Sequence, residues 1–307
     1  MRSECRQDRQ INLENIHGYH HGNYDSYKVF VSDRPTETDA SYRLPDGTLP
    51  AMIGIELETE CWGISNATAY ATILKEICFK TFPADLWKVE SDCTLNGGDC
   101  GAECITQPMT RAFIRNHYRD FKAMFEMFAR LGIDCARTGD CGQHAHISLT
   151  CFGRTKATQD EAIRKLYYIV NRHYDLILAL LYRRADRRRW CGRMDPDVAW
   201  TMDLNYMDPD HANGFNGSHY RRGNIELRIP GGQKDYPCFR NTMESIFQLI
   251  DAAKSISRKD CDDVTKVFAG CNQHVFDRLR TYCLERGTIS DEQLSAIRAT
   301  VKTVDFR

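Results

Sequence analysis

The sequence predicts an α+β fold in which a sheet with one apolar face packs against helices. Three segments alternate between polar and apolar residues: 51–60, 144–151 and 222–229. Such alternation is typical of strands that bury one face. Other segments repeat apolar residues at helical spacing, and the strongest of these, 110–131, includes Phe121 and Phe128 in its stripe.

The composition excludes several classes of protein. The chain has 307 residues, 42% of them hydrophobic, so it can bury a large core. A net charge of −1 gives no overall field that would attract nucleic acid or an anionic membrane. No apolar run approaches the roughly 18 residues of a membrane helix, and the N-terminal segment lacks the apolar core of a secretory signal. We therefore expect a cytoplasmic protein that binds neither nucleic acid nor membrane.

The 14 cysteines agree with that compartment. They are scattered without a CxxC pair, and a chain of this size does not need disulfides to fold. We expect most of them to be reduced, buried core residues. No motif gives a functional reason for so high a count.

The chain begins with its least regular part. Residues 1–50 are polar, include Cys5 together with His17, His20 and His21, and end in a turn-rich segment. These four side chains could bind zinc, but no second pair at zinc-finger spacing follows them. We predict that residues 1–50 form a polar N-terminal extension or lid.

Regular elements begin with the strand at 51–60. A helix is predicted from Asn66 to about Phe79, followed by short strands at 86–90 and 103–107. The Gly-rich segment 96–99 forms the turn between these two strands.

Two long helices are predicted in the middle of the chain. The first starts at Thr110 and ends at Gly132. The second follows the strand at 144–151 and reaches about Tyr182. Thr158 and Glu161 match the capping-box pattern at its start.

The last part of the chain is mainly helical. A basic, loop-like stretch at 183–193 precedes the third strand, and Ser290 with Gln293 forms a capping box for the final helix. The helices are expected at about 237–257, 263–280 and 290–301. Because no repeat or linker divides the chain, we predict one main domain at 51–257 and a C-terminal helical extension at 258–307 that packs on it.

The polar faces of the three alternating strands carry acidic, imidazole and guanidinium groups. They are Glu56, Glu58 and Glu60 on the first strand, His144, His146 and Ser148 on the second, and Arg222, Asn224, Glu226 and Arg228 on the third. If the strands share a sheet, these groups collect on one surface and helices cover the other. Polar residues on a solvated sheet face are ordinary, but packed carboxylates repel one another and need a cation. Mg²⁺ commonly binds a few carboxylates and substrate phosphates, and two divalent ions would balance the four charges of Glu56, Glu58, Glu103 and Glu226.

Other chemistries leave weaker signals. The sequence has no GxSxG, HExxH, P-loop or GxGxxG motif. His144 and His146 could bind Zn²⁺, but two histidines two residues apart are a weak signal on their own.

Four motifs, in order, carry a resemblance to a known family. The segments GIELETE, GAECITQP, CGQHAHISL and RGNIELRIP span roughly residues 51–255. Together they resemble the amidoligase family of the glutamine synthetase-like superfamily of carboxylate–amine ligases. The resemblance implies a curved, mainly antiparallel sheet with helices packed on its outer face and the active site on its concave face.

The resemblance also implies an ATP-dependent ligase that uses Mg²⁺ or Mn²⁺, with two or more ions. The positions that match metal ligands are Glu56, Glu58, Glu103, His144 and Glu226. Those that match contacts to the nucleotide phosphates and the transferring phosphoryl group are His146, Arg222 and Arg228. Glu60 is a further metal ligand or a base that deprotonates the amine, and a solvated strand end is the alternative. The expected substrates are a small-molecule or peptide carboxylate and an amine, and the motifs identify neither.

Three other functions remain compatible with these residues. A metal-dependent amide hydrolase would use the same Glu and His cluster with water as nucleophile. A non-catalytic binding module would retain only remnants of a site. The stretch 183–193 could bind nucleic acid, clamp an acidic substrate or simply be solvated.

Overall fold

The structure is a computed structural model of the chain. It describes residues 29–31, 34–36, 50–61, 67–82, 86–91, 95, 101–136, 141–184, 191–207, 212–218 and 220–304. Asn66, the predicted turn at 96–99 and Cys5 with its three neighbouring histidines lie outside the described residues.

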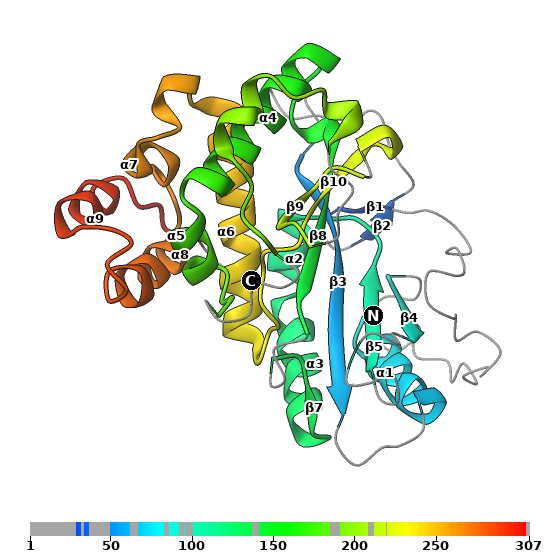
Figure 1. The fold of residues 1–307 in the computed structure, drawn as a ribbon. Coiled ribbons are helices and arrows are strands. Elements are labelled where there is room, and N and C mark those ends of the chain that lie inside the picture. The colour runs from blue at the N-terminus through cyan, green and yellow to red at the C-terminus, as the bar shows by residue number, and fades with distance from the viewer. Residues whose placement is uncertain are drawn as a thin grey trace.

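The described part of the chain contains an open sheet of ten strands, which forms the centre of the molecule in Figure 1. The strands are β1 (Val29–Val31), β2 (Arg34–Thr36), β3 (Met52–Cys61), β4 (Trp87–Ser91), β5 (Gly101–Thr106), β6 (Met109–Thr110), β7 (Ile133–Asp134), β8 (Gln143–Ser148), β9 (Phe215–Asn216) and β10 (Asn224–Leu227). The main path through the sheet is β2-β1-β6-β3-β8-β10-β9, and β5 and β7 pair with β3 while β4 pairs with β5. All pairs are antiparallel except β1 with β6. The predicted α+β fold with a mainly antiparallel sheet is therefore confirmed.

The register brings the three alternating strands together as predicted. β8 pairs with β3 on one side and with β10 on the other. Glu56 lies opposite His144, and His146 lies opposite Glu226. Because directly opposed residues share a face, the acidic and imidazole side chains occupy one side of the sheet.

The other side of the sheet is the apolar core. Ile53, Ile55 and Ile147 on this face are at most 1% exposed. The helices pack against it on one side of the sheet (Figure 1), and Gln143 of β8 contacts Met243 of a long helix. The helices are α1 (Ala67–Thr81), α2 (Arg111–Asn116), α3 (Tyr118–Arg130), α4 (Lys156–Arg172), α5 (Tyr174–Leu180), α6 (Tyr236–Ser255), α7 (Val264–Val267), α8 (Gln273–Arg278) and α9 (Asp291–Arg298).

Two predicted long helices are each divided at a histidine. His117 ends α2 and begins α3, where its backbone leaves the helical region, and its ring stacks on Phe113 at 4.2 Å. His173 divides α4 from α5 in the same way. Since the apolar stripe continues through both breaks, the sequence pattern alone predicted single helices.

The helix caps confirm one prediction and correct another. Ser290 and Gln293 form the predicted capping box of α9. At α4, however, the cap is Thr155, whose hydroxyl accepts from the Thr158 N–H. The pair Thr158 and Glu161 predicted Thr158 as the cap. The helix instead begins three residues earlier, at Lys156, so Thr158 is its third residue.

Two further predicted elements are shorter than expected. The predicted helix at 263–280 is α7 and α8, separated by Gly270 at φ +68° and by the N-cap Asn272. The third alternating segment forms a strand only from Asn224 to Leu227. Arg222 belongs to a 3₁₀ helix, and Gly223 at φ +92° turns the chain between the two elements. Arg222 is therefore not a strand residue.

The C-terminal helices share the core of the sheet domain. Glu244 of α6 accepts a hydrogen bond of 2.6 Å from Asn272, and Gln248 donates one to the Val267 carbonyl. Val264 and Ile297 belong to the same buried cluster as Ile55.

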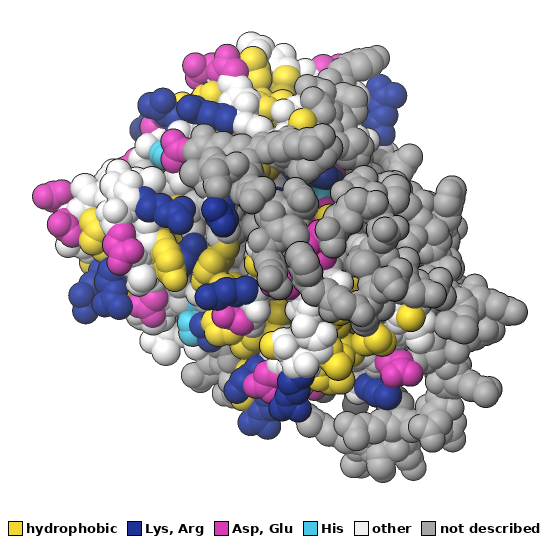
Figure 2. Space-filling view, turned by 60° about the horizontal axis from the view of Figure 1, so that its bottom comes forward, with side chains coloured by type: hydrophobic (Ala, Val, Ile, Leu, Met, Phe, Trp, Pro, Cys, Tyr) yellow, Lys and Arg dark blue, Asp and Glu magenta, His cyan; other side chains and the backbone are white. Residues whose placement is uncertain are grey.

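The described cysteines are buried as expected, and charges of both signs are spread over the described surface. The eleven cysteines of the described part are all buried and unbridged, as predicted. Figure 2 shows basic and acidic side chains mixed over the part of the surface drawn in colour. No helix within the described ranges is long and apolar enough to cross a membrane.

Candidate metal and phosphate site

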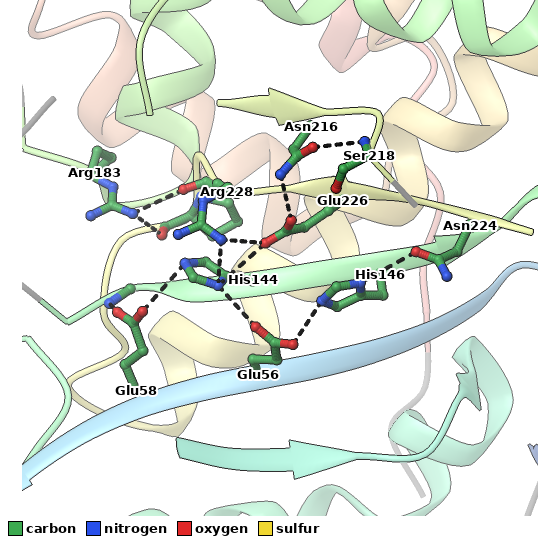
Figure 3. Close-up of polar contacts among 12 residues, drawn as sticks. Glu56, Glu58, His144, His146, Arg183, Asn216, Ser218, Asn224, Glu226 and Arg228 are labelled. Atoms are coloured by element: carbon green, nitrogen blue, oxygen red, sulfur yellow. Dashed lines mark hydrogen bonds and ion pairs between the residues drawn. The ribbon is translucent and has the colours of Figure 1, made fainter. Parts of the chain in front are cut away.

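The polar face of β3, β8 and β10 forms a connected cluster of acidic and basic groups (Figure 3). Glu56 lies between two imidazoles: one carboxylate oxygen is 3.1 Å from His144 Nδ1, and the other is 3.0 Å from His146 Nε2. Alternation on β8 places both histidines on this face, and the antiparallel register aligns them with β3.

Glu226 is the centre of a second group of contacts. It is 2% exposed, accepts from Asn216 at 3.1 Å and pairs with Arg228 Nη1 at 2.6 Å. Its carboxylate is 3.4 Å from His144 Nδ1, so His144 connects the two glutamates. Arg228 follows β10 directly, which explains why it reaches the same surface.

The charges of the cluster shift one another's pKa values. Burial would raise the pKa of Glu56, but the charge of His146 and the hydrogen bonds with both imidazoles hold that pKa well below its ordinary range. Burial would lower the pKa of His146, yet the charge of Glu56 and its hydrogen bond raise it to about 9. Burial would also raise the pKa of Glu226, but His144, His146 and Arg228 lower it. The positive charges of His146 and Arg228 therefore offset the negative charges of Glu56 and Glu226.

Three side chains are close enough together to share one metal ion. Glu56, His146 and Glu226 each offer a ligand atom, and these atoms all lie within 4.8 Å of one another. Two carboxylates and an imidazole are a donor set that fits Mg²⁺ or Mn²⁺. The side chains of Glu56 and His146 remain 17% and 21% exposed, so a ligand can approach them.

Asn224 orients one of these groups. Its side-chain oxygen is 3.4 Å from His146 Nδ1, the ring nitrogen that does not face Glu56. A hydrogen bond on the outer nitrogen of a ligating imidazole fixes its orientation and tautomer.

A row of carboxylates extends the polar face away from the triad of Glu56, His146 and Glu226. Glu58 lies opposite Glu103, and Glu103 lies opposite Glu90. All three are at most 7% exposed. Glu58 accepts from the Gly142 N–H and is 3.5 Å from His144 Nε2. Lys88 binds Glu90 at 2.6 Å, so part of this negative charge is already balanced.

The remaining predicted site residues are placed less centrally. Glu60 shares the polar face and is 1% exposed, which rules out the solvated strand end as its environment. Arg222 lies before β10 in the 3₁₀ helix. Glu56, Glu58, His144, His146, Glu226 and Arg228 are thus brought together, Glu103 adjoins them across β5, and Glu60 lies further along β3.

The basic stretch at 183–193 begins with a structural residue. Arg183 is 4% exposed and donates to the carbonyls of Arg228, Ile229 and Pro230. It therefore fixes the chain just after Arg228 and is not part of a solvated charge run. Residues 185–190 lie outside the described part.

Sequence reasoning missed two polar residues of this face and the contact made by a third. Asn216 lies in a two-residue strand, too short for alternation to be detected. Glu90 was within a predicted strand, but its position in the carboxylate row depends on pairing with β5. Asn224 was on the predicted face, and only the structure shows its contact with His146.

Comparison with known proteins adds little to this geometry. No family model and no curated protein matches the sequence. The solved structures that align with it include GmaS in complex with ADP, conformation 1, at 12% identity and a TM-score of 0.43, and GmaS without ligand at 11% identity and a TM-score of 0.45. Each alignment covers 82% of this chain and 68% of the GmaS chain. Likeness at this level identifies neither the family nor the activity of this chain.

Proposed function

We propose that this protein is an ATP- and divalent-metal-dependent carboxylate–amine ligase. The observation that carries the proposal is the gathering of Glu56, His146 and Glu226, with Arg228 beside them, on one face of an open sheet. Three of the four motifs that resemble amidoligases supply these residues, and the fourth supplies Glu103. Carboxylates for metal ions and a guanidinium for phosphoryl oxygens are the groups that phosphoryl transfer requires.

The reaction follows from the poor reactivity of a carboxylate toward amines. A substrate carboxylate oxygen attacks the γ-phosphorus of ATP, and ADP leaves, which gives an acyl phosphate. The amine then attacks the acyl carbon, phosphate leaves with its bonding electrons, and the amine loses a proton to a base. The carboxylates of the polar face would hold divalent ions, and these would neutralise charge on the phosphates.

The geometry favours a specific division of roles. Glu56 and Glu226 are metal ligands in this proposal, and His146 joins them because its ring lies within the triad. His144, Glu58 and Glu103 are the ligands proposed for further ions. Arg228 is the proposed contact to phosphoryl oxygens, Arg222 is proposed as a second one, and Glu60 is the proposed base.

A substrate screen tests this function. The pure protein is incubated with ATP, Mg²⁺ or Mn²⁺, and pools of amino acids, short acidic peptides and amines. We expect ADP and phosphate to be released in step with a new amide, detected by mass spectrometry. Amide cleavage without ATP would instead identify the hydrolase. A non-catalytic module would be identified if Glu56→Ala and His144→Ala left the function unchanged and the protein bound no metal.

A further inference from the structure

A basic pocket lies where the C-terminal helices meet the segment that follows β10. Its volume is about 260 Å³, enough for a small ligand or for one end of a larger one. Five of its twelve lining residues are cationic, and none is an Asp or Glu. The cationic residues are Arg183, Arg184, Lys234, Arg278 and Arg286.

Arg278 is the buried cation of this pocket. It is 3% exposed, and its guanidinium carbon lies 3.5 Å from the ring centre of Tyr182 and 3.4 Å from that of Tyr282. One nitrogen donates to the Ala179 carbonyl, whereas Nε and Nη1 have no hydrogen-bond partner in the described part of the chain. A buried charge without a counter-ion is costly, and the two aromatic faces offset only part of that cost.

The neutral groups of the lining do not supply the missing negative charge. Burial raises the pKa of Tyr182 to about 12, and burial together with Asp235 raises the pKa of Cys238 to about 12. Both groups therefore stay protonated at neutral pH. Asp235 itself is 3.9 Å from Lys234, a distance at which an exposed pair is weak.

The walls of the pocket are preformed. Tyr182 has φ +60°, a strained conformation for a non-glycine residue, and its hydroxyl accepts from Asn241 at 2.8 Å. A Cβ on Gly231 would lie 2.4 Å from the Tyr182 carbonyl oxygen, so only glycine allows this close packing. Tyr282 belongs to a π-helical segment, Leu279–Cys283, and such segments are frequent at functional sites.

The pocket adjoins the polar face of the sheet without being part of it. A Cβ built on Gly142 would lie 2.9 Å from Arg183 Nη2 and 3.3 Å from Glu58 Oε2. Arg183, which lines the pocket, and Glu58 thus approach Gly142 together, and Figure 3 shows both at the same end of the site. Arg278, Tyr282 and Arg286 come from the C-terminal extension, outside the motifs that define the proposed ligase site.

We propose that this pocket binds a small ligand through a carboxylate or phosphate group. Arg286 and Lys234 contact the anion from the open side, and the buried charge of Arg278 attracts it across a medium of low dielectric constant. The inference concerns binding alone and does not depend on the ligase activity.

Isothermal titration without nucleotide or metal, at constant ionic strength, tests the pocket with inorganic phosphate and with succinate. We expect saturable binding of one or both at one site per chain, and no binding of the neutral analogue succinamide. If only phosphate or only succinate binds, the result identifies the anionic group that the pocket prefers. Loss of a charge-assisted contact should weaken binding roughly tenfold in Arg286→Gln and in Lys234→Gln.

Arg280→Gln is the matched control. Arg280 lies in the same π-helical segment, has a side chain that is 57% exposed and does not line the pocket, so its removal should leave the affinity unchanged. Arg278→Gln should also weaken binding, and the near-UV circular dichroism spectrum of this variant shows whether it is folded. The proposal is overturned if neither anion binds, if succinamide binds equally well, or if Arg286→Gln and Arg280→Gln bind alike.

Discussion

The acidic residues of the polar face are positioned by neighbouring side chains and backbone groups. Asn216 and Arg228 hold Glu226, and the Gly142 N–H binds Glu58. Such contacts orient metal ligands and make their removal costly for affinity. The residues that hold the carboxylates should therefore matter nearly as much as the carboxylates themselves.

Replacing Glu226 by Gln should abolish tight metal binding. The substitution preserves the volume of the side chain but removes one of the two negative charges of the triad. We expect Mn²⁺ affinity to fall by roughly 100-fold or more, since outer-shell changes alone cost about 10–100-fold. Titration calorimetry with Mn²⁺ measures the change. Glu126→Gln, on the exposed side of α3, is the control, and equal affinities of the two variants would contradict the assignment.

Replacing Asn224 by Ala tests the orientation of His146. The variant removes the contact of Asn224 with the outer ring nitrogen, so Mn²⁺ binding should weaken about 10–100-fold while the fold is retained. Asn224→Asp keeps an acceptor oxygen and should restore most of the affinity. An alanine variant with wild-type affinity would show that His146 does not need this contact.

At the scale of elements, the breaks at His117 and His173 are the least predictable features. Both interrupt helices whose apolar stripe continues, so the sequence gives no periodic signal of the break. The structure shows what each histidine gains: His117 binds Asp120 at 2.7 Å, and His173 Nε2 donates to the Cys261 carbonyl at 2.9 Å. Each break is accompanied by a polar contact of the histidine side chain, and the spacing of apolar residues cannot predict such a contact.

His173 should make the protein sensitive to mild acid. Burial, the largest effect, lowers the pKa of His173 below its ordinary value of 6.5. The unfolded chain therefore binds more protons just below about pH 6.5, and stability falls as the pH drops through that range. Urea unfolding at about pH 7 and about pH 5 should show a smaller loss for His173→Gln than for the wild type. His274, whose pKa is lowered too, acts in the same direction, whereas His146, whose pKa is raised to about 9, acts in the opposite direction. The test is therefore the difference between the two proteins, and identical losses in both would exclude His173 as a cause.

Thr155 rather than Thr158 should be the stabilising cap of α4. Its hydroxyl accepts from the Thr158 N–H, one of the otherwise unpaired donors at the helix start. Thr155→Ala should lower the free energy of unfolding by about 1 kcal/mol, measured in urea. Thr303→Ala, at an exposed position outside the helices, should leave it unchanged.

At the scale of the whole molecule, polar contacts join the sheet domain to the C-terminal helices. Glu244 of α6 binds Arg115 through two hydrogen bonds of 2.7 Å and accepts a third from Asn272. Glu244→Ala should destabilise the protein by about 3 kcal/mol, because it removes the ion pair and both hydrogen bonds that Glu244 makes with the partly buried Arg115. Urea unfolding should remain a single transition; two separate transitions would show that the C-terminal helices unfold independently.

The sequence predicted which side chains lie on the polar face better than it predicted which of them converge into one cluster. The alternation of polar and apolar residues within β3 and β8 predicts which side chains share a face, since a strand has a period of two. Which of two histidines joins Glu56 and Glu226 depends on register and rotamer, and no local pattern encodes these. The short strand β9 and the turn at Gly223 were invisible for the same reason, because they are defined by pairing and backbone angle.

Nucleotide binding with metal present tests the central claim most directly. Titration of the protein with ATP and Mn²⁺ should give saturable binding in the wild type, and Glu226→Gln should lose most of it while remaining folded. Binding of neither Mn²⁺ nor ATP by the folded wild-type protein, or equal binding by Glu226→Gln, would contradict the assignment of this face to metal ions and phosphates.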